Sequence, residues 1–162
     1  MDTLKDVYLD QLKDLYSAAT QARDATRDLA GAAGSDRLRE ALERGVSGIE
    51  DGLGNLQSLV RSHDADPEGE HCKGMEGLVR EARLHALEEE FGNDAARDAM
   101  IISQYQRMAH YAIAGYGCVL AFAQELELKD DAATLRQMLE AAHSGDETMT
   151  EIAMEKVNAR AA

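Results

Sequence analysis

The chain has 162 residues, 44% of them hydrophobic, and a formal net charge of -14 at pH 7. That length suits one domain with one core, and the strong negative charge disfavours nucleic acids and anionic membranes as partners. No run approaches the roughly 18 apolar residues of a membrane span, and residues 1–10 lack the basic and apolar regions of a signal peptide, so we expect a cytoplasmic protein.

Apolar side chains recur every three or four residues along four long segments, which predicts four main helices. Ser35 and Asn93 precede the second and third of these segments and are favourable N-cap residues. The connection between the two pairs holds the only proline, which indicates a loop. In chain order, the expected elements are helices over about 2–30 and 35–62, a crossover over 63–93 with a short helix at about 75–89, and helices over about 94–126 and 131–157.

Two helices, a long crossover and two more helices follow the order of a ferritin-like bundle. The sequence therefore predicts an all-α fold, a ferritin-like four-helix bundle whose long crossover carries a short extra helix. Four glycines, Gly45, Gly48, Gly52 and Gly54, fall inside the second helix. Each costs about 1 kcal/mol relative to alanine there, which indicates that side-chain bulk is excluded from this stretch.

Five short segments carry a resemblance to a known family. They are Asp14–Ala18, Cys72–Leu78 (Cys-Lys-Gly-Met-Glu-Gly-Leu), Arg97–Ala99, His110–Gly117 (His-Tyr-Ala-Ile-Ala-Gly-Tyr-Gly) and Met149–Ala153. In this order the chain resembles the YciE/YciF-like ferritin-like stress proteins of bacteria over nearly its whole length. The resemblance implies a four-helix ferritin-like bundle, often a homodimer, with a dimetal carboxylate site in its core.

The chain departs from this family at the metal ligands that the resemblance implies. The family's ligand positions are occupied here by Ala19, Ser47, Gly48, Gly52, Ala109, Ala112, Ala141 and Ala142. Only Asp146, on the fourth helix, keeps a carboxylate near that level. Two cations in a bundle core need a glutamate from each of two helices and a Glu-x-x-His from each of the others. We therefore predict no bound metal and no cofactor.

Two functions remain for a bundle without this site. The first is a non-catalytic protein with a structural or interaction role, such as a homodimer in a bacterial stress response. The alternative is that a small hydrophobic or aromatic ligand occupies the vacated cavity, with metal-free acid/base chemistry through Asp146 as a further option. The candidate cavity residues are Gln11, Tyr16, Ala19, Gly48, Gly52, Tyr105, Ala109, Ala112, Tyr116, Ala142 and Asp146.

The crossover offers a second set of metal-ligand types, namely His63, Asp64, Asp66, His71 and Cys72. Histidine with cysteine suits zinc or copper, but the spacing matches no zinc motif. A solvated acidic loop is the favoured interpretation, and metal binding there stays open.

Three further signals indicate ordinary helix chemistry. Glu140 and His143 have the Glu-x-x-His spacing, but the helical periodicity places Glu140 outward, which favours a solvated surface. Met108 lies off the predicted core stripe. Cys72 and Cys118 are expected to be free thiols, and Cys118 to be buried and inert.

Overall fold

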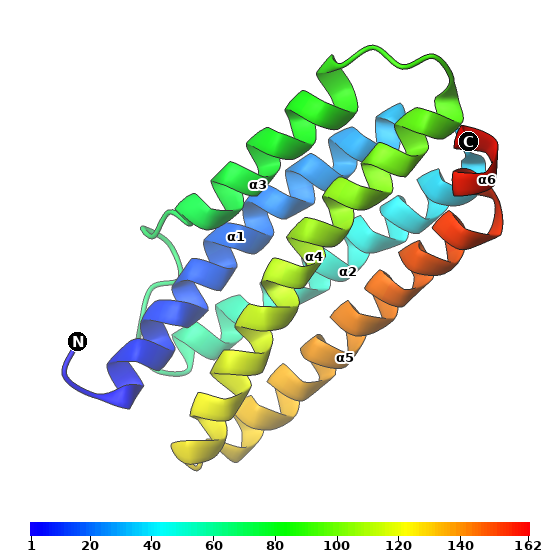
Figure 1. The fold of residues 1–162 in the computed structure, drawn as a ribbon. Coiled ribbons are helices and arrows are strands. Elements are labelled where there is room, and N and C mark those ends of the chain that lie inside the picture. The colour runs from blue at the N-terminus through cyan, green and yellow to red at the C-terminus, as the bar shows by residue number, and fades with distance from the viewer.

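In a computed structural model, the chain folds into four long helices and a shorter one that lies along them (Figure 1). The structure describes residues 1–162 apart from the side chain of Lys156. The helices are α1 (Leu4–Ala32), α2 (Asp36–Arg61), α3 (Lys73–Arg83), α4 (Asp94–Glu125), α5 (Lys129–Ile152) and the terminal α6 (Asn158–Ala161), with π-helical turns η1 (Leu84–Glu88) and η2 (Ala153–Val157) after α3 and α5. No strand occurs in the described residues, and the fold is the ferritin-like four-helix bundle.

The helices begin and end within a few residues of the ranges expected from the sequence, apart from the C-terminal ends of α3 and α5, where the π-helical turns η1 and η2 follow. The crossover helix starts two residues earlier than expected because the Cys72 Sγ accepts a hydrogen bond from the Met75 N–H at 3.4 Å. The last long helix also starts earlier, at Lys129, and its regular α-helical turns end at Ile152, where η2 begins. Asp130 and Asp131 lie in its first turn, where negative charge stabilises a helix.

The long helices form two antiparallel pairs, α1 with α2 and α4 with α5. The crossover carries the chain back along the bundle, so α2 and α4 run in the same direction (Figure 1). Contacts of α1 with α4 and of α2 with α5 join the pairs, and the seam between α2 and α5 is the loosest of the four. The short α3 packs outside the bundle on α1 and α4.

A buried carboxylate fixes the turn between α1 and α2. Asp98, which is 3% exposed, accepts hydrogen bonds from the backbone N–H groups of Gly34 at 2.8 Å and Ser35 at 2.9 Å. Because Asp98 belongs to α4, these bonds tie the turn of the first helix pair to the second pair. The charge is compensated by two backbone donors, as a buried carboxylate requires.

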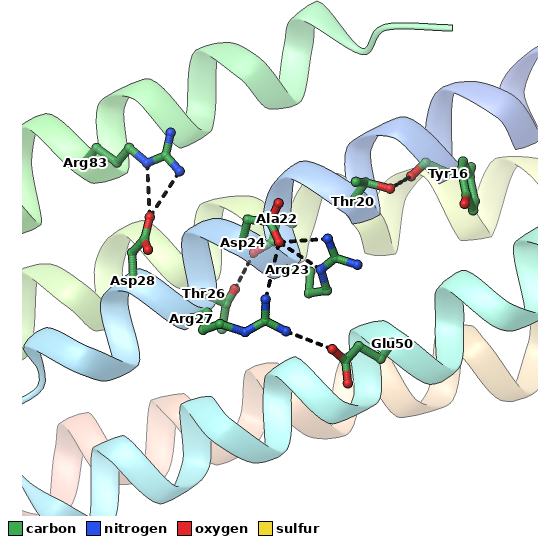
Figure 2. A network of polar contacts seen from close by, with 10 residues as sticks. All are labelled: Tyr16, Thr20, Ala22, Arg23, Asp24, Thr26, Arg27, Asp28, Glu50 and Arg83. Atoms are coloured by element: carbon green, nitrogen blue, oxygen red, sulfur yellow. Dashed lines mark hydrogen bonds and ion pairs between the residues drawn. The ribbon is translucent and has the colours of Figure 1, made fainter. Parts of the chain in front are cut away.

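Ion pairs on the surface join α1 to α2 and to α3 (Figure 2). Arg27 of α1 lies 2.8 Å from Glu50 of α2, and Asp28 of α1 lies 3.0 Å from Arg83 of α3. All four side chains are about half exposed, so each pair contributes only about 0–1 kcal/mol.

The hydrophobic core falls into two clusters, one toward each end of the bundle. One includes Leu29, Leu42 and Ile101, and the other includes Tyr8, Leu12, and Leu56. Packing between them, at mid-height, involves small side chains from all the long helices. Within the described residues, no helix is long and apolar enough to cross a membrane.

Candidate functional site

A cavity of about 430 Å³ lies where the two core clusters meet, and all four long helices line it. This volume falls near the lower end of the range for ligand pockets, about 300–1,000 Å³. The structure brings eight of the eleven candidate residues to its wall, namely Ala19, Gly48, Gly52, Tyr105, Ala109, Ala112, Tyr116 and Ala142.

Two tyrosines of α4 stand toward the two ends of this cavity. A β-carbon on Gly45 would lie 3.0 Å from the Tyr105 Oη, and one on Gly145 would lie 3.7 Å from it. In the same way, a β-carbon on Gly52 would lie 3.5 Å from the Tyr116 Oη. The glycines at these places give the two phenol hydroxyls room against α2 and α5.

Between the tyrosines, small side chains from all four long helices make up part of the wall. Ala109 and Ala112 of α4 line the cavity together with Ala19 of α1 and Ala142 of α5. Gly48 of α2 also lines it, and a β-carbon there would have no atom within 4 Å. Because none of these residues extends past a methyl group, the middle of the bundle stays open.

Neither phenol hydroxyl has a hydrogen-bond partner among the residues that the structure describes, although each tyrosine is only 8% exposed. Burial raises the pKa of Tyr116 to about 12. It also raises the pKa of Tyr105, with a smaller contribution from the negative charge of Asp146. Both groups are therefore neutral hydrogen-bond donors at physiological pH.

The cavity opens to solvent along the loose seam between α2 and α5. Arg44, Asp51 and Asn55 of α2 and Gln137 and Ala141 of α5 line it and are exposed. Among the described residues, the charged side chains of the lining are thus at the mouth, and the interior is apolar apart from the tyrosine and threonine hydroxyls.

Three of the candidate residues do not line the cavity, which corrects the prediction for them. Gln11 lies one turn before Leu15, the first residue of α1 at the wall, and its amide reaches Asp10. Tyr16 is half-buried and lies about 100° around α1 from the lining face. Asp146 lies about as far around α5, on the side that faces α4.

The Asp146 carboxylate makes its hydrogen bonds outside the cavity. Its Oδ1 accepts a hydrogen bond from the Gln106 Nε2 at 3.1 Å, and its Oδ2 lies 3.0 Å from the His110 Nε2. His110 is an exposed boundary residue. The deeply buried carboxylate of the bundle is Asp98, whose role periodicity alone does not reveal.

The residues at mid-height do not fit a dimetal site. Alanine and glycine supply no donor atom, and the carboxylate nearest to that level, Asp146, points elsewhere. In the described part of the chain, no group of three or more His, Cys, Asp or Glu side chains is placed to hold a metal ion.

The candidate ligands of the crossover lie with separate partners. His63 pairs with Asp131 at 2.6 Å, and His71 pairs with Glu76 at 3.0 Å. The Cys72 Sγ lies 3.0 Å from the Tyr111 Oη. These groups therefore act as separate contacts between elements.

Both cysteines are free thiols, but Cys118 is exposed, so its predicted burial is wrong. Tyr116 and Val119 face the core at this level of α4, which turns Cys118 toward solvent. Met108, expected off the core stripe, is 2% exposed and lines the cavity. Because α3 and α1 cover α4 on one side and α5 on another, its buried face is wider than one stripe.

Comparison with known proteins shows one family and similarity to two named relatives. The family model described as "Domain of unknown function (DUF892)" matches residues 3–162. Protein YciF of Escherichia coli (strain K12) is 30% identical over 99% of this chain and 96% of its own length. The crystal structure of this E. coli stress protein superposes with a TM-score of 0.90, covering 98% of this chain and 99% of that one. YcfI of Rhodopseudomonas palustris, described as a proposed structural protein, is 26% identical, with a TM-score of 0.87 and coverage of 93% and 94%.

Proposed function

The chain belongs to the DUF892 family, and on that premise we propose that it is a non-catalytic ferritin-like bundle protein without the dimetal carboxylate site, with a structural or interaction role in a stress response. The observation that carries this proposal is the mid-height layer, where all four long helices present alanine or glycine. The stress-related part rests on the E. coli relative, which is named a stress protein.

An iron titration of the purified apoprotein tests the loss of the metal site. We expect no tight binding, because hard cations need carboxylate and imidazole donors that the layer lacks. A di-iron bundle protein measured in parallel calibrates the assay. Two equivalents of iron bound tightly to this chain would contradict the proposal.

A second candidate function is the binding of a small hydrophobic or aromatic molecule in the cavity. Its volume of about 430 Å³ is the observation that favours this candidate. Because the cavity opens to solvent, its apolar walls are in contact with water, and an apolar ligand that covers them would remove this surface from water.

A cavity-filling variant tests this second function. Ala109→Leu places three more carbons on the cavity wall, and Ala121→Leu makes the same change at an exposed position of α4. If a ligand is bound, native mass spectrometry of protein purified from its own host shows an added mass that Ala109→Leu loses and Ala121→Leu keeps. Bound mass that survives in Ala109→Leu would place the ligand elsewhere.

The proposal includes a homodimer and a cytoplasmic location, both expected from the sequence and its family resemblance. The same native mass spectra report the subunit count directly. A monomer at micromolar concentration would contradict the dimer, and cell fractionation tests the location.

A further inference from the structure

We infer that the cavity takes a neutral, mostly hydrocarbon molecule that carries a carbonyl or similar acceptor oxygen, and that the Tyr116 hydroxyl binds this oxygen. The inference rests on the second proposed function, ligand binding in the cavity, and deepens it by naming the chemical class.

The hydroxyls of Tyr105 and Tyr116 are available as hydrogen-bond donors in the cavity. Neither hydroxyl oxygen is among the fully enclosed side-chain atoms without a partner, so each reaches the open space of the cavity, where a ligand oxygen can accept its hydrogen bond in place of water. Tyr105 and Tyr116 are each 8% exposed, line the cavity, and have no hydrogen-bond partner within the described residues. Both are protonated near pH 7, as tyrosines ordinarily are, and burial raises their pKa values further. A phenol O–H donates more strongly than it accepts, so its fitting partner is an acceptor oxygen.

The charges at the wall exclude an ionic ligand from the interior. The charged residues that line the cavity, Arg44 and Asp51, are exposed at its mouth. A charge carried past them would lose its hydration without gaining a counterion. The ligand is therefore neutral over the part that enters.

The neighbours of the two hydroxyls differ, which favours Tyr116 as the binding group. Asp146 acts on Tyr105 with its negative charge, which would oppose an electron-rich oxygen there. Near the Tyr116 hydroxyl lie Gly52 and the Met138 side chain, neither of which carries a charge. An acceptor oxygen is thus stabilised more by Tyr116.

The spacing of the two tyrosines along α4 indicates the shape of ligand that the cavity accepts. They are eleven residues apart on α4, which is three turns and about 16 Å along the axis, so both lie on one face. Ala109 and Ala112 lie between them on that face. The result is a slot suited to a flat or elongated molecule of two or three rings.

The probes are 9-fluorenone and fluorene, which share a flat three-ring shape and differ in the carbonyl. In equilibrium dialysis against the wild-type protein, we expect fluorenone to bind about fivefold more tightly than fluorene, the effect of one neutral hydrogen bond. The infrared carbonyl stretch of bound fluorenone should shift to lower frequency, a measurement that needs no variant.

Three variants complete the test, each first checked for helical content. Tyr116→Phe should abolish the preference for fluorenone while fluorene binds as before. Ala112→Leu should abolish binding of both probes, and Ala121→Leu, at an exposed site of the same helix, should change neither.

Other outcomes separate the inference from the function on which it rests. Equal affinities for the two probes in the wild-type protein, both lost in Ala112→Leu, would overturn the role of Tyr116 and leave a purely apolar binding cavity. Binding of neither probe up to its solubility would overturn the inference together with the second proposed function.

Discussion

Two regions of the same bundle treat buried tyrosine hydroxyls in opposite ways. At one end, the Tyr8 hydroxyl donates to the Asp131 carboxylate at 2.8 Å, and His63 Nε2 lies 2.6 Å from the same oxygen. The Lys5 Nζ lies 2.7 Å from His63 Nδ1. In the middle, the hydroxyls of Tyr105 and Tyr116 lack partners within the described residues. We call Lys5, Tyr8, His63 and Asp131 the end network.

This difference indicates that the end network stabilises the fold, whereas the cavity hydroxyls are available to bind a ligand. Lysine has no acceptor, so His63 accepts at Nδ1 and donates from Nε2 to Asp131, and the network is complete in itself. A complete, partly buried network stabilises one arrangement of helices, here α1, α5 and the start of the crossover. Partnerless hydroxyls in a cavity add nothing to the fold and are available to a ligand.

The largest expected effect is the removal of the centre of the end network. Asp131→Ala leaves the hydroxyl of Tyr8 and the ring of His63 without their acceptor, and we expect a loss of about 3 kcal/mol in the free energy of unfolding. Asp130→Ala is the matched control, since Asp130 is exposed and lies in the same first turn of α5. It should cost no more than about 1 kcal/mol, the effect of charge at a helix N-terminus. Equal losses in urea unfolding would mean that Asp131 acts only through the helix dipole.

The next largest effect is a loss of stability at alkaline pH that originates in Tyr116 of the cavity. An unfolded tyrosine ionises near pH 10, whereas burial raises the pKa of Tyr116 to about 12. Between these values the unfolded chain binds fewer protons than the folded one, so stability is unchanged below about pH 10 and falls as the pH rises toward 12. The loss is on the order of 2 kcal/mol. Tyr116→Phe should remove this part of the decline, measured as the difference between urea unfolding curves of the two proteins.

A smaller effect separates the two kinds of tyrosine at neutral pH. Tyr8→Phe removes a hydrogen bond to a charged group and should cost about 1.5–3 kcal/mol, near the low end because Asp131 keeps His63. Tyr116→Phe removes a hydroxyl without a protein partner and should change stability by less than about 0.5 kcal/mol. Thermal and urea unfolding measure both. Similar losses would mean that the Tyr116 hydroxyl has a partner after all, such as an ordered water.

Periodicity and capping residues were enough to predict the bundle. Ser35 and Asn93 cap α2 and α4, because a side-chain oxygen before an apolar stripe is a local signal. The small side chains of the cavity were also predictable, since Gly48, Gly52 and Ala109 repeat at helical spacing. The open volume that these small residues surround, and the placement of Tyr105 and Tyr116 at its two ends, depend on contacts between helices.

The misplacement of Tyr16 and Asp146 has one physical cause. A helical stripe is defined only to within about 100°, so Tyr16 and Asp146 were placed on the cavity although they lie on the flanks of their helices. The bonds of Asp98 to Gly34 and of Asp131 to His63 join residues more than sixty positions apart. No periodicity within one helix encodes such pairs, and only the packing of the four helices brings them together.

The smallest expected effect compares two glycines of α2. Gly54 is exposed, and a β-carbon there would have no atom within 4 Å, so Gly54→Ala should stabilise the protein by about 0.5–1 kcal/mol through helix propensity alone. Gly45→Ala gains the same propensity, but its β-carbon would lie only 3.0 Å from the Tyr105 Oη and must displace the phenol. Its net gain should therefore be smaller, as measured by urea unfolding. Equal gains would show that Tyr105 moves freely into the open cavity, and that Gly45 is not needed to seat its hydroxyl.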